Sequence, residues 1–354
     1  MASKGGQIDI GFVEECEDWK LHSRFFPSKV GGKPAWLNLK DLPKPSDVLC
    51  GKCSEPCIFL CQIYAPGDEE PEAFHRSLFV FTCKNGSCCR INNADNFIVF
   101  RCQLKRDNEY YPFEPPVENK DEVFKDTKWV ALCNVCGAKG PNHCAKCKKV
   151  NYCSRTHQII DWKNGHKEQC SNDEVVTPAE VKANLLFPQW ELVIDEEGEE
   201  LPRKTSEEEE LKYLNQLIAE KQAGSLMDEN ETELEQYANK AVEDKTFEKF
   251  KDRINRDPGQ VLRYNRGGTP LWIAAQPIPT EEEIPNCPNC NSKRQFECQI
   301  MPQLLNYLNL DLGVNCLDWG VIAIYTCSKN CTEGAAYKKE FLFKQDVSQS
   351  IVSS

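Results

Sequence analysis

The sequence predicts a mainly β protein in which two related, zinc-binding halves pair into one discontinuous domain. Three observations predict this class: a motif that occurs twice, cysteine pairs that follow both copies, and a different cysteine cluster between them. Self-similarity over such distances indicates a repeated structural unit, which constrains the fold before any single element is considered. The chain between the halves is expected to form an inserted zinc finger and an acidic linker that is partly helical or disordered.

The repeated motif is Gly-Gly-x-Pro-x-Trp, which begins at Gly31 and again at Gly267. Each copy is followed, in the same order, by a Cys-x2-Cys pair, a Phe-x-Cys-Gln-Ile segment and an aromatic-Thr-Cys segment. The glycines permit backbone angles that are closed to other residues, and the proline fixes the next turn. Because the tryptophan buries a large ring, each copy predicts a tight turn that is anchored in a core.

The expected strands are short segments rich in aromatic and β-branched residues, bounded by Gly, Pro, Asn and Asp. Three lie in each repeat, at 58–64, 77–82 and 97–104 and at 295–300, 321–326 and 340–344. A further strand within 185–194 is expected to return the chain to the main body. A half with three short strands is too small for a secure core, so we expect the halves to pair about a pseudo-twofold axis. Two independent units are the alternative.

The acidic linker carries nine carboxylates against two basic residues between 195 and 210. Thr205 or Ser206, followed by glutamates, can cap a helix that extends to about residue 218. The apolar residues of this helix share one face: Leu211, Leu214, Leu217 and Ile218. Two more helices are expected around 234–242 and 247–254, and the last should stop near Pro258.

Composition limits the classes of function. The chain has 21 cysteines, no secretory signal after Met1 and no apolar run long enough to span a membrane. In a reducing compartment such a cysteine-rich chain is expected to bind metal rather than to form disulfides. The net charge of −12 disfavours direct binding to nucleic acid and favours a basic protein partner. No nucleophile elbow or phosphate-binding glycine loop is visible, so no enzymatic activity is expected. No membrane association is expected either, because no apolar run is long enough to span a membrane.

Each repeat offers four thiolates, which are the ligands that Zn²⁺ takes in closed tetrahedral sites. Two cysteine pairs on separate turns are compatible with a zinc-ribbon-like arrangement. We predict one zinc site in each repeat, formed by Cys50, Cys53, Cys83 and Cys88 in the first and by Cys287, Cys290, Cys327 and Cys331 in the second. Cys89 is an alternative to Cys88.

The central cluster reads Cys133-x2-Cys136-x7-Cys144-x2-Cys147-x5-Cys153-x3-His157-x8-His166-x3-Cys170. Eight such ligands suit two tetrahedral Zn²⁺ sites. Because all ligand positions are filled, neither zinc has an open position for water, and such sites hold a fold rather than catalyse.

The spacing of this cluster and the residues around it resemble the MYND zinc finger family. The resemblance implies interleaved sites, with one zinc held by Cys133, Cys136, Cys153 and His157 and the other by Cys144, Cys147, His166 and Cys170. It also implies a shallow groove for short proline-containing peptides. Gln158 and Trp162 would line that groove.

Three further segments, at 26–36, 301–305 and 318–320, together with the finger, resemble the programmed cell death protein 2 family. The resemblance implies a dedicated chaperone or adaptor, in the cytoplasm and the nucleus. Its partner would be a newly made small-subunit ribosomal protein of the universal S-five type, and it would support 40S ribosome assembly. The acidic segment from Asp195 to about Val242 is the candidate shield for this basic partner. The alternative is a nuclear MYND adaptor that recruits transcriptional corepressors through proline-containing peptides.

Together these features divide the chain into six parts. They are a lead-in (1–30), the first β-rich zinc-binding repeat (31–130), the MYND finger (131–172), the acidic linker (173–244), the C-terminal family domain with the second zinc-binding repeat (245–346) and a tail (347–354).

Overall fold

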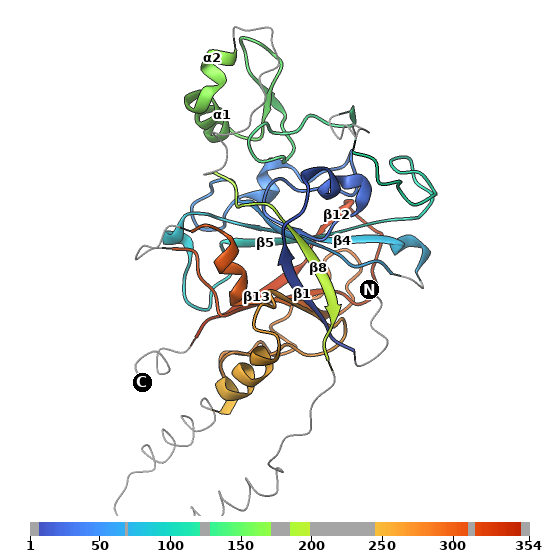
Figure 1. The fold of residues 1–354 in the computed structure, drawn as a ribbon, viewed down its shortest axis with the longest axis vertical. Helices are drawn as coiled ribbons and strands as arrows, with labels where there is room; N and C mark the ends of the chain where they lie inside the picture. The colour runs from blue at the N-terminus through green and yellow to red at the C-terminus, as the bar shows by residue number, and fades with distance from the viewer. Residues whose placement is uncertain are drawn as a thin grey trace, which may run out of the picture.

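The fold is dominated by a single curved sheet (Figure 1). The computed structural model describes residues 7–67, 70–120, 128–170, 185–198, 245–310 and 316–347. In this part of the chain the sheet occupies the middle of the molecule, the finger projects from one end, and a helix over 245–256 lies at the other. Among the described residues, no helix is both long and apolar enough to cross a membrane.

Each half supplies four neighbouring strands to this sheet. The first half forms β2 (Lys29–Val30), at the end of the lead-in, and then β3 (Ile58–Tyr64), β4 (His75–Thr82) and β5 (Phe97–Leu104). The second repeat forms β9 (Leu262–Tyr264), β10 (Arg294–Ile300), β11 (Val321–Cys327) and β13 (Phe341–Gln345). The six strands expected in the repeats are therefore confirmed, with ends that differ by at most two residues.

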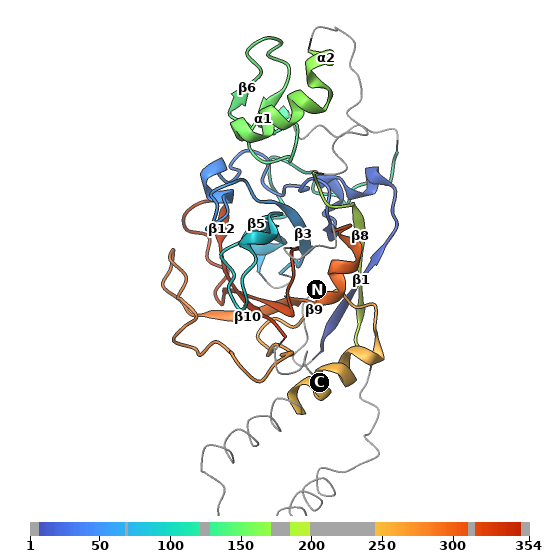
Figure 2. The same ribbon diagram turned by 90° about the vertical axis from the view of Figure 1, so that its left-hand side faces the viewer.

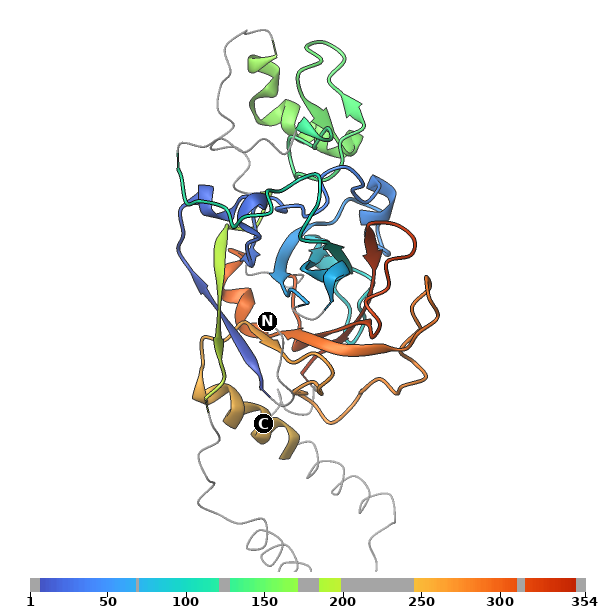
Figure 3. The same cartoon turned by 90° about the vertical axis from the view of Figure 1, so that its right-hand side faces the viewer.

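Two strands from outside the repeats join the halves. They are β1 (Asp9–Glu14) and β8 (Trp190–Glu196). With the short strand β12 (Tyr337–Lys339) at one end, the strand order is β12-β5-β4-β3-β2-β8-β1-β9-β10-β11-β13. Figure 3 shows β1 and β8 side by side along one edge of the molecule. The expectation that the halves pair into one discontinuous domain is confirmed. The two strands β1 and β8 lie between the halves in the sheet and connect them.

The β1 strand was not expected, because a glycine interrupts its apolar pattern. Gly11 is required by close packing, since a Cβ atom at this position would lie 2.9 Å from the Cβ atom of Leu262 on β9. Glycine within a strand marks such close approaches of another chain segment. The expected strand at 185–194 is also shifted, because β8 begins only at Trp190.

The two ends of the sheet meet in the second repeat. The short strand β12 (Tyr337–Lys339) pairs with β5 of the first repeat, while β13 pairs with β11. Only Glu340 separates β12 from β13 along the chain, so the sheet curls until its end strands are neighbours (Figure 2). The curled sheet encloses a core to which both halves contribute.

The repeats share a β-bulge, which is one extra residue in one strand of a pair. The register slips between Phe59 and Cys61 in the first repeat and between Phe296 and Cys298 in the second. In the second repeat the extra residue is Glu297, whose side chain is fully buried.

The glutamine that follows each bulge holds the Gly-Gly-x-Pro-x-Trp turn of its own repeat. The Gln62 side chain accepts a hydrogen bond from the Ala35 N–H at 2.9 Å and donates to the Ala35 carbonyl at 3.3 Å. Gln299 forms the same pair of bonds with Leu271, at 2.6 and 2.9 Å. The sequence repeat is therefore a structural repeat down to single hydrogen bonds.

A buried ion pair connects the halves across the interior. Glu297 on β10 binds Arg76 on β4 through both carboxylate oxygens, and neither side chain is more than 1% exposed. Tyr264 donates to the same carboxylate at 3.0 Å, and Thr326 also donates to it. Burial alone would raise the pKa of Glu297, but the adjacent Arg76 guanidinium lowers it to about 2.

The helix expected near 247–254 is present over 245–256, followed by a turn that contains Pro258. It packs through Phe250 and Ile254 on a small cluster with residues of the second repeat. The other two expected helices, up to residue 218 and around 234–242, lie outside the described residues.

Replacing Glu297 by Gln should destabilise the protein by about 3–5 kcal/mol, because Arg76 is left buried without its counter-charge. The pKa of Glu297 is depressed from 4.5 to about 2, so the contribution is complete above pH 4.5 and is lost as the pH falls through 2. Urea denaturation at pH 7 measures the change. The matched control is Glu281→Gln, which removes an exposed ion pair with Lys293 and should cost about 0–1 kcal/mol. Equal effects of both variants would contradict the role of the buried pair.

Candidate metal centres

Four clusters of cysteine and histidine have the composition of closed zinc sites. In each cluster the four potential ligand atoms lie within 4.8 Å of one another. The clusters bring together the sets expected from the spacing and from the MYND resemblance: Cys50, Cys53, Cys83 and Cys88; Cys133, Cys136, Cys153 and His157; Cys144, Cys147, His166 and Cys170; and Cys287, Cys290, Cys327 and Cys331.

The separations within these clusters fit a tetrahedral zinc ion. With Zn–S bonds of about 2.3 Å, tetrahedral geometry requires sulfur atoms about 3.8 Å apart. The Sγ atoms of Cys53 and Cys83 are 3.7 Å apart, and those of Cys144 and Cys170 are 3.8 Å apart. All 21 cysteines are free, so these approaches are not disulfides. The donor sets therefore suit Zn²⁺, and its presence in each site stays a prediction.

The Cys-x2-Cys pairs share one local backbone structure. In each pair, the residue just after the second cysteine has a positive φ angle and donates its N–H to the carbonyl of the first cysteine. This compact turn aims both thiols at the same point. The residues with positive φ are Ser54, Gly137, Lys148 and Asn291.

Two thiols of these pairs are shifted towards the thiolate form, which is the form that binds metal. Burial would raise the pKa of Cys144, but the backbone N–H of Cys147 and the side chain of His166 lower it to about 6. In the second repeat, the hydroxyl and the N–H of Ser292 lower the pKa of Cys290 to about 6. Both thiols are therefore ionised more readily than an ordinary cysteine.

The structure distinguishes between the two adjacent cysteines of the first repeat. Cys88 lies in the cluster, whereas the Cys89 thiol donates to the carbonyl of Asp318 at 3.0 Å, so Cys89 is not the ligand. Cys61 and Cys298 occupy equivalent strand positions in the core, as expected, and burial raises the pKa of both thiols.

The finger interleaves its two clusters around a buried aspartate. Asp161 accepts hydrogen bonds from Asn134 at 2.8 Å and from the Tyr152 hydroxyl at 2.9 Å, which ties the first turn of the finger to its helix. Ser154 caps that helix by accepting from the N–H of His157. The elements of the finger are β6 (Asn142–His143), β7 (Asn151–Tyr152), α1 (Arg155–Asp161), a π-helical turn (Trp162–His166) and α2 (Lys167–Gln169).

The finger docks on the first repeat through its backbone. The indole N–H of Trp36 donates to the carbonyl of Gly137 at 2.7 Å, and the Lys33 ammonium donates to the carbonyl of Asn134 at 2.9 Å. A Cβ atom at Gly137 would lie 2.9 Å from the Cβ atom of Lys33, so glycine permits the close approach. On its other side Trp36 packs edge-on against Tyr337 of the second repeat.

These docking contacts were not expected from the sequence. The repeat motif predicted that Trp36 is buried, but the partner in its hydrogen bond comes from a segment about 100 residues away. The one available signal was that Lys33 of the first copy is replaced by Thr269 in the second.

The predicted groove residues lie together on the finger. Gln158 and Trp162 are one turn apart, so their side chains share a face, and Trp162 is 37% exposed. Ile159 beside them is 43% exposed. Peptide binding at this surface stays a prediction.

Native mass spectrometry should find four zinc ions per chain, because four closed ligand sets are present. Cys133→Ser should reduce the count to two, because metal binding in small fingers supplies most of their stability, and an unfolded finger releases the ions of both interleaved sites. Cys16→Ser is the control, because Cys16 belongs to none of the clusters, and it should retain four ions. Fewer than four ions in the unmodified chain would contradict the assignment.

Replacing Trp36 by Phe should loosen the finger without releasing its zinc, because the smaller phenyl ring keeps most of the aromatic packing while the hydrogen bond to the finger is lost. Loss of a bond of about 1 kcal/mol predicts roughly fivefold faster hydrogen exchange of the backbone around residues 133–137. Trp272→Phe changes the equivalent residue of the second repeat and should leave exchange in the finger unchanged. An unchanged rate in both variants would show that this bond does not hold the finger.

Comparisons with known families agree with this architecture. The pattern of the programmed cell death protein 2 N-terminal domain matches residues 7–118, and that of the programmed cell death protein 2 C-terminal putative domain matches residues 244–346. The pattern of the MYND finger matches residues 133–170. No solved structure is found to match the chain.

Similar proteins cover nearly the whole chain. Programmed cell death protein 2 of Bos taurus is 42% identical over 99% of this chain and 100% of its own length. The protein of the same name in Mus musculus is 42% identical over 99% of both chains. The probable 20S rRNA accumulation protein 4 of Schizosaccharomyces pombe is 25% identical over 85% of this chain and 87% of its own length. With both halves, the finger and the overall length in agreement, the chain belongs to the programmed cell death protein 2 family.

Proposed function

We propose that this chain is a non-catalytic, zinc-stabilised chaperone for a newly made small-subunit ribosomal protein of the universal S-five type. It acts in the cytoplasm and the nucleus and supports 40S ribosome assembly. The name of the fission yeast relative refers to the accumulation of a ribosomal RNA, which supports a role in ribosome biogenesis. Each of the four metal clusters contains four protein ligands, which supports structural rather than catalytic zinc.

The observation that carries the proposal is an acidic ribbon, which we define as the carboxylates of β1 and β8. Asp9 lies directly opposite Glu196, and Glu14 lies directly opposite Glu191. Directly opposed residues point to the same face of a sheet, and like charges there destabilise the pair. The two pairs are five positions apart along the strands, so they lie on opposite faces of the ribbon. Burial raises the pKa of Asp9, and the negative charge of Glu196 raises it further.

A basic partner would relieve this repulsion. Ribosomal proteins carry basic segments that bind ribosomal RNA in the assembled subunit. Before assembly, an acidic surface of another protein can neutralise the charge of these segments. The chain supports such a role as a whole, because its net charge is −12. The acidic segment between Asp195 and Val242 continues the ribbon along the chain, although it lies mostly outside the described residues.

The test is affinity purification of the tagged full-length chain from cells, with mass spectrometry of the proteins that co-purify. The unmodified chain should retain the small-subunit ribosomal protein of the S-five type. A triple variant of the acidic ribbon should retain severalfold less, because each substitution removes a charge from the same face of the ribbon: Glu14→Gln, Glu191→Gln and Asp195→Asn.

The matched control removes the same net charge from an exposed turn of the second repeat, through Glu281→Gln, Glu282→Gln and Glu283→Gln. This control should retain the ribosomal protein fully. Absence of any small-subunit ribosomal protein from the unmodified chain would refute the proposal. Equal losses in both triple variants would refute the role of the acidic ribbon.

A second candidate function is favoured by the exposed surface of the finger. Ile159 and Trp162 form an apolar surface beside Gln158, which suits corepressor-type peptides that contain proline. The same purification distinguishes the two functions. Trp162→Ala should leave the ribosomal protein bound under the chaperone proposal, whereas it should remove the main partners if the protein is a nuclear corepressor adaptor.

A further inference from the structure

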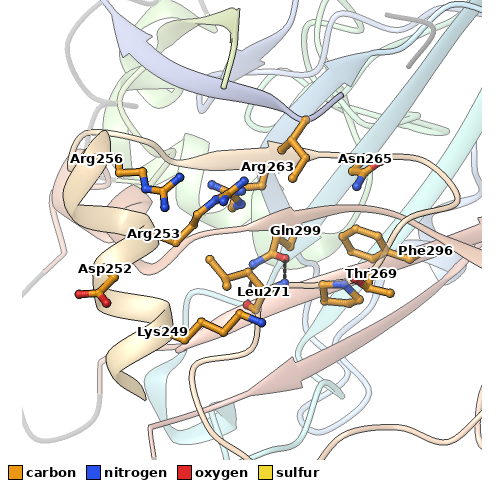
Figure 4. Close-up of a pocket in the computed structure, with 12 residues that line it drawn as sticks. Lys249, Asp252, Arg253, Arg256, Arg263, Asn265, Thr269, Leu271, Phe296 and Gln299 are labelled. Atoms are coloured by element: carbon orange, nitrogen blue, oxygen red, sulfur yellow. Dashed lines mark hydrogen bonds between the residues drawn. The ribbon is translucent and has the colours of Figure 1, made fainter. Parts of the chain in front are cut away.

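A cavity of about 250 Å³ lies between the helix over 245–256 and the strands β9 and β10. None of the metal ligands lines it. Figure 4 shows the helix along one side and the Gly-Gly-x-Pro-x-Trp turn of the second repeat along the other. The cavity is therefore built where the helix crosses the repeat.

The charge of this cavity is opposite to that of the protein. Four basic side chains line it: Lys249, Arg253, Arg256 and Arg263. The carboxylate of Asp252 is the acidic group in the lining, and in Figure 4 it points away from the cavity. In a chain with a net charge of −12, such a concentration of cations marks a site for an anionic group.

The protein already places one carboxylate beside these cations. Glu197, just after β8, binds Arg253 at 2.7 Å and Arg263 at 2.8 Å. Burial would raise the pKa of Glu197, but the two arginines lower it, so it is ionised. Glu197 thus contacts two of the four cations of the cavity. Lys249 makes no ion pair within the part of the chain that the structure describes.

The opposite wall of the cavity suits a peptide. Phe296, Pro270 and Leu271 supply apolar surface, and the side chain of Gln299 fixes the turn by its bonds to Leu271. The equivalent turn of the first repeat, through Lys33 and Trp36, binds the backbone carbonyls of the finger. This type of turn therefore binds a chain segment elsewhere in the same molecule.

We propose that the cavity binds an acidic peptide segment of a partner protein. A carboxylate side chain of the peptide is held by Lys249 and Arg256, and a neighbouring apolar side chain packs on Phe296 and Leu271. The inference goes beyond the ribosomal-protein proposal, because a basic client is repelled by this cavity and attracted by the acidic ribbon. One molecule could then hold a basic client and an acidic partner at the same time, on surfaces of opposite charge.

Fluorescence anisotropy of the full-length, zinc-loaded protein tests the proposal. The probe is a fluorescein-labelled peptide, Glu-Glu-Leu-Glu-Glu-Phe-Gly, compared with the same peptide in which Gln replaces every Glu. The acidic peptide should bind and its Gln form should bind at least about tenfold more weakly, because charge-assisted bonds are lost. The variant Lys249→Gln/Arg256→Gln should weaken the acidic peptide by a similar factor.

The matched control is Lys245→Gln/Lys251→Gln, which removes the same charge from the same helix at positions that do not line the cavity. It should bind the acidic peptide as the unmodified protein does. No binding to the unmodified protein, equal binding of the Gln peptide, or equal losses in both double variants would overturn the proposal. Tighter binding of a short oligonucleotide than of the acidic peptide would overturn it too, in favour of phosphate. The purification of the ribosomal protein is unaffected by each of these results, so the two proposals fail independently.

Discussion

The buried ion pair between Arg76 and Glu297 is the constraint on which the arrangement of the two halves depends. Its partners come from different repeats, and both are removed from water, so neither half can bury its charge alone. The β-bulge of the second repeat turns Glu297 inward, and Tyr264 and Thr326 satisfy its remaining hydrogen bonds. A second pair, between Arg101 and Glu340, repeats this linkage where the ends of the sheet meet.

The metal centres and the ion pairs are coupled to one another. The guanidinium of Arg101 lies 3.8 Å from the sulfur of Cys331, a predicted zinc ligand of the other repeat. Close to Arg101, where Tyr337 pairs with Cys102, Trp36 connects the finger to the second repeat through its contacts with Gly137 and Tyr337. The predicted zinc sites therefore lie beside the surfaces on which the finger and the halves meet.

The protein separates its charges into two surfaces. The acidic ribbon lies on β1 and β8, where like charges oppose one another, and the cationic cavity lies beside the end of that ribbon. Glu197 is the boundary between them, because it follows the acidic strand and is compensated by Arg253 and Arg263. A surface that costs energy in the free protein favours a partner of opposite charge, and the two surfaces favour partners of opposite sign.

The sequence by itself determined the local features of this protein. The strands of both repeats, the helix that ends near Pro258 and the four-cysteine set of each repeat follow from periodicity, turn residues and spacing. The grouping of the eight ligands of the finger came from its resemblance to the MYND family. Only the tertiary structure decided which strands join the halves. Gly11 interrupts the apolar pattern of β1, and the partners of this strand are far away in the sequence. The same holds for the Arg76–Glu297 pair, the docking of the finger on Trp36 and the cationic cavity. Each depends on residues that meet only after the sheet has closed, and no local pattern records such distant contacts.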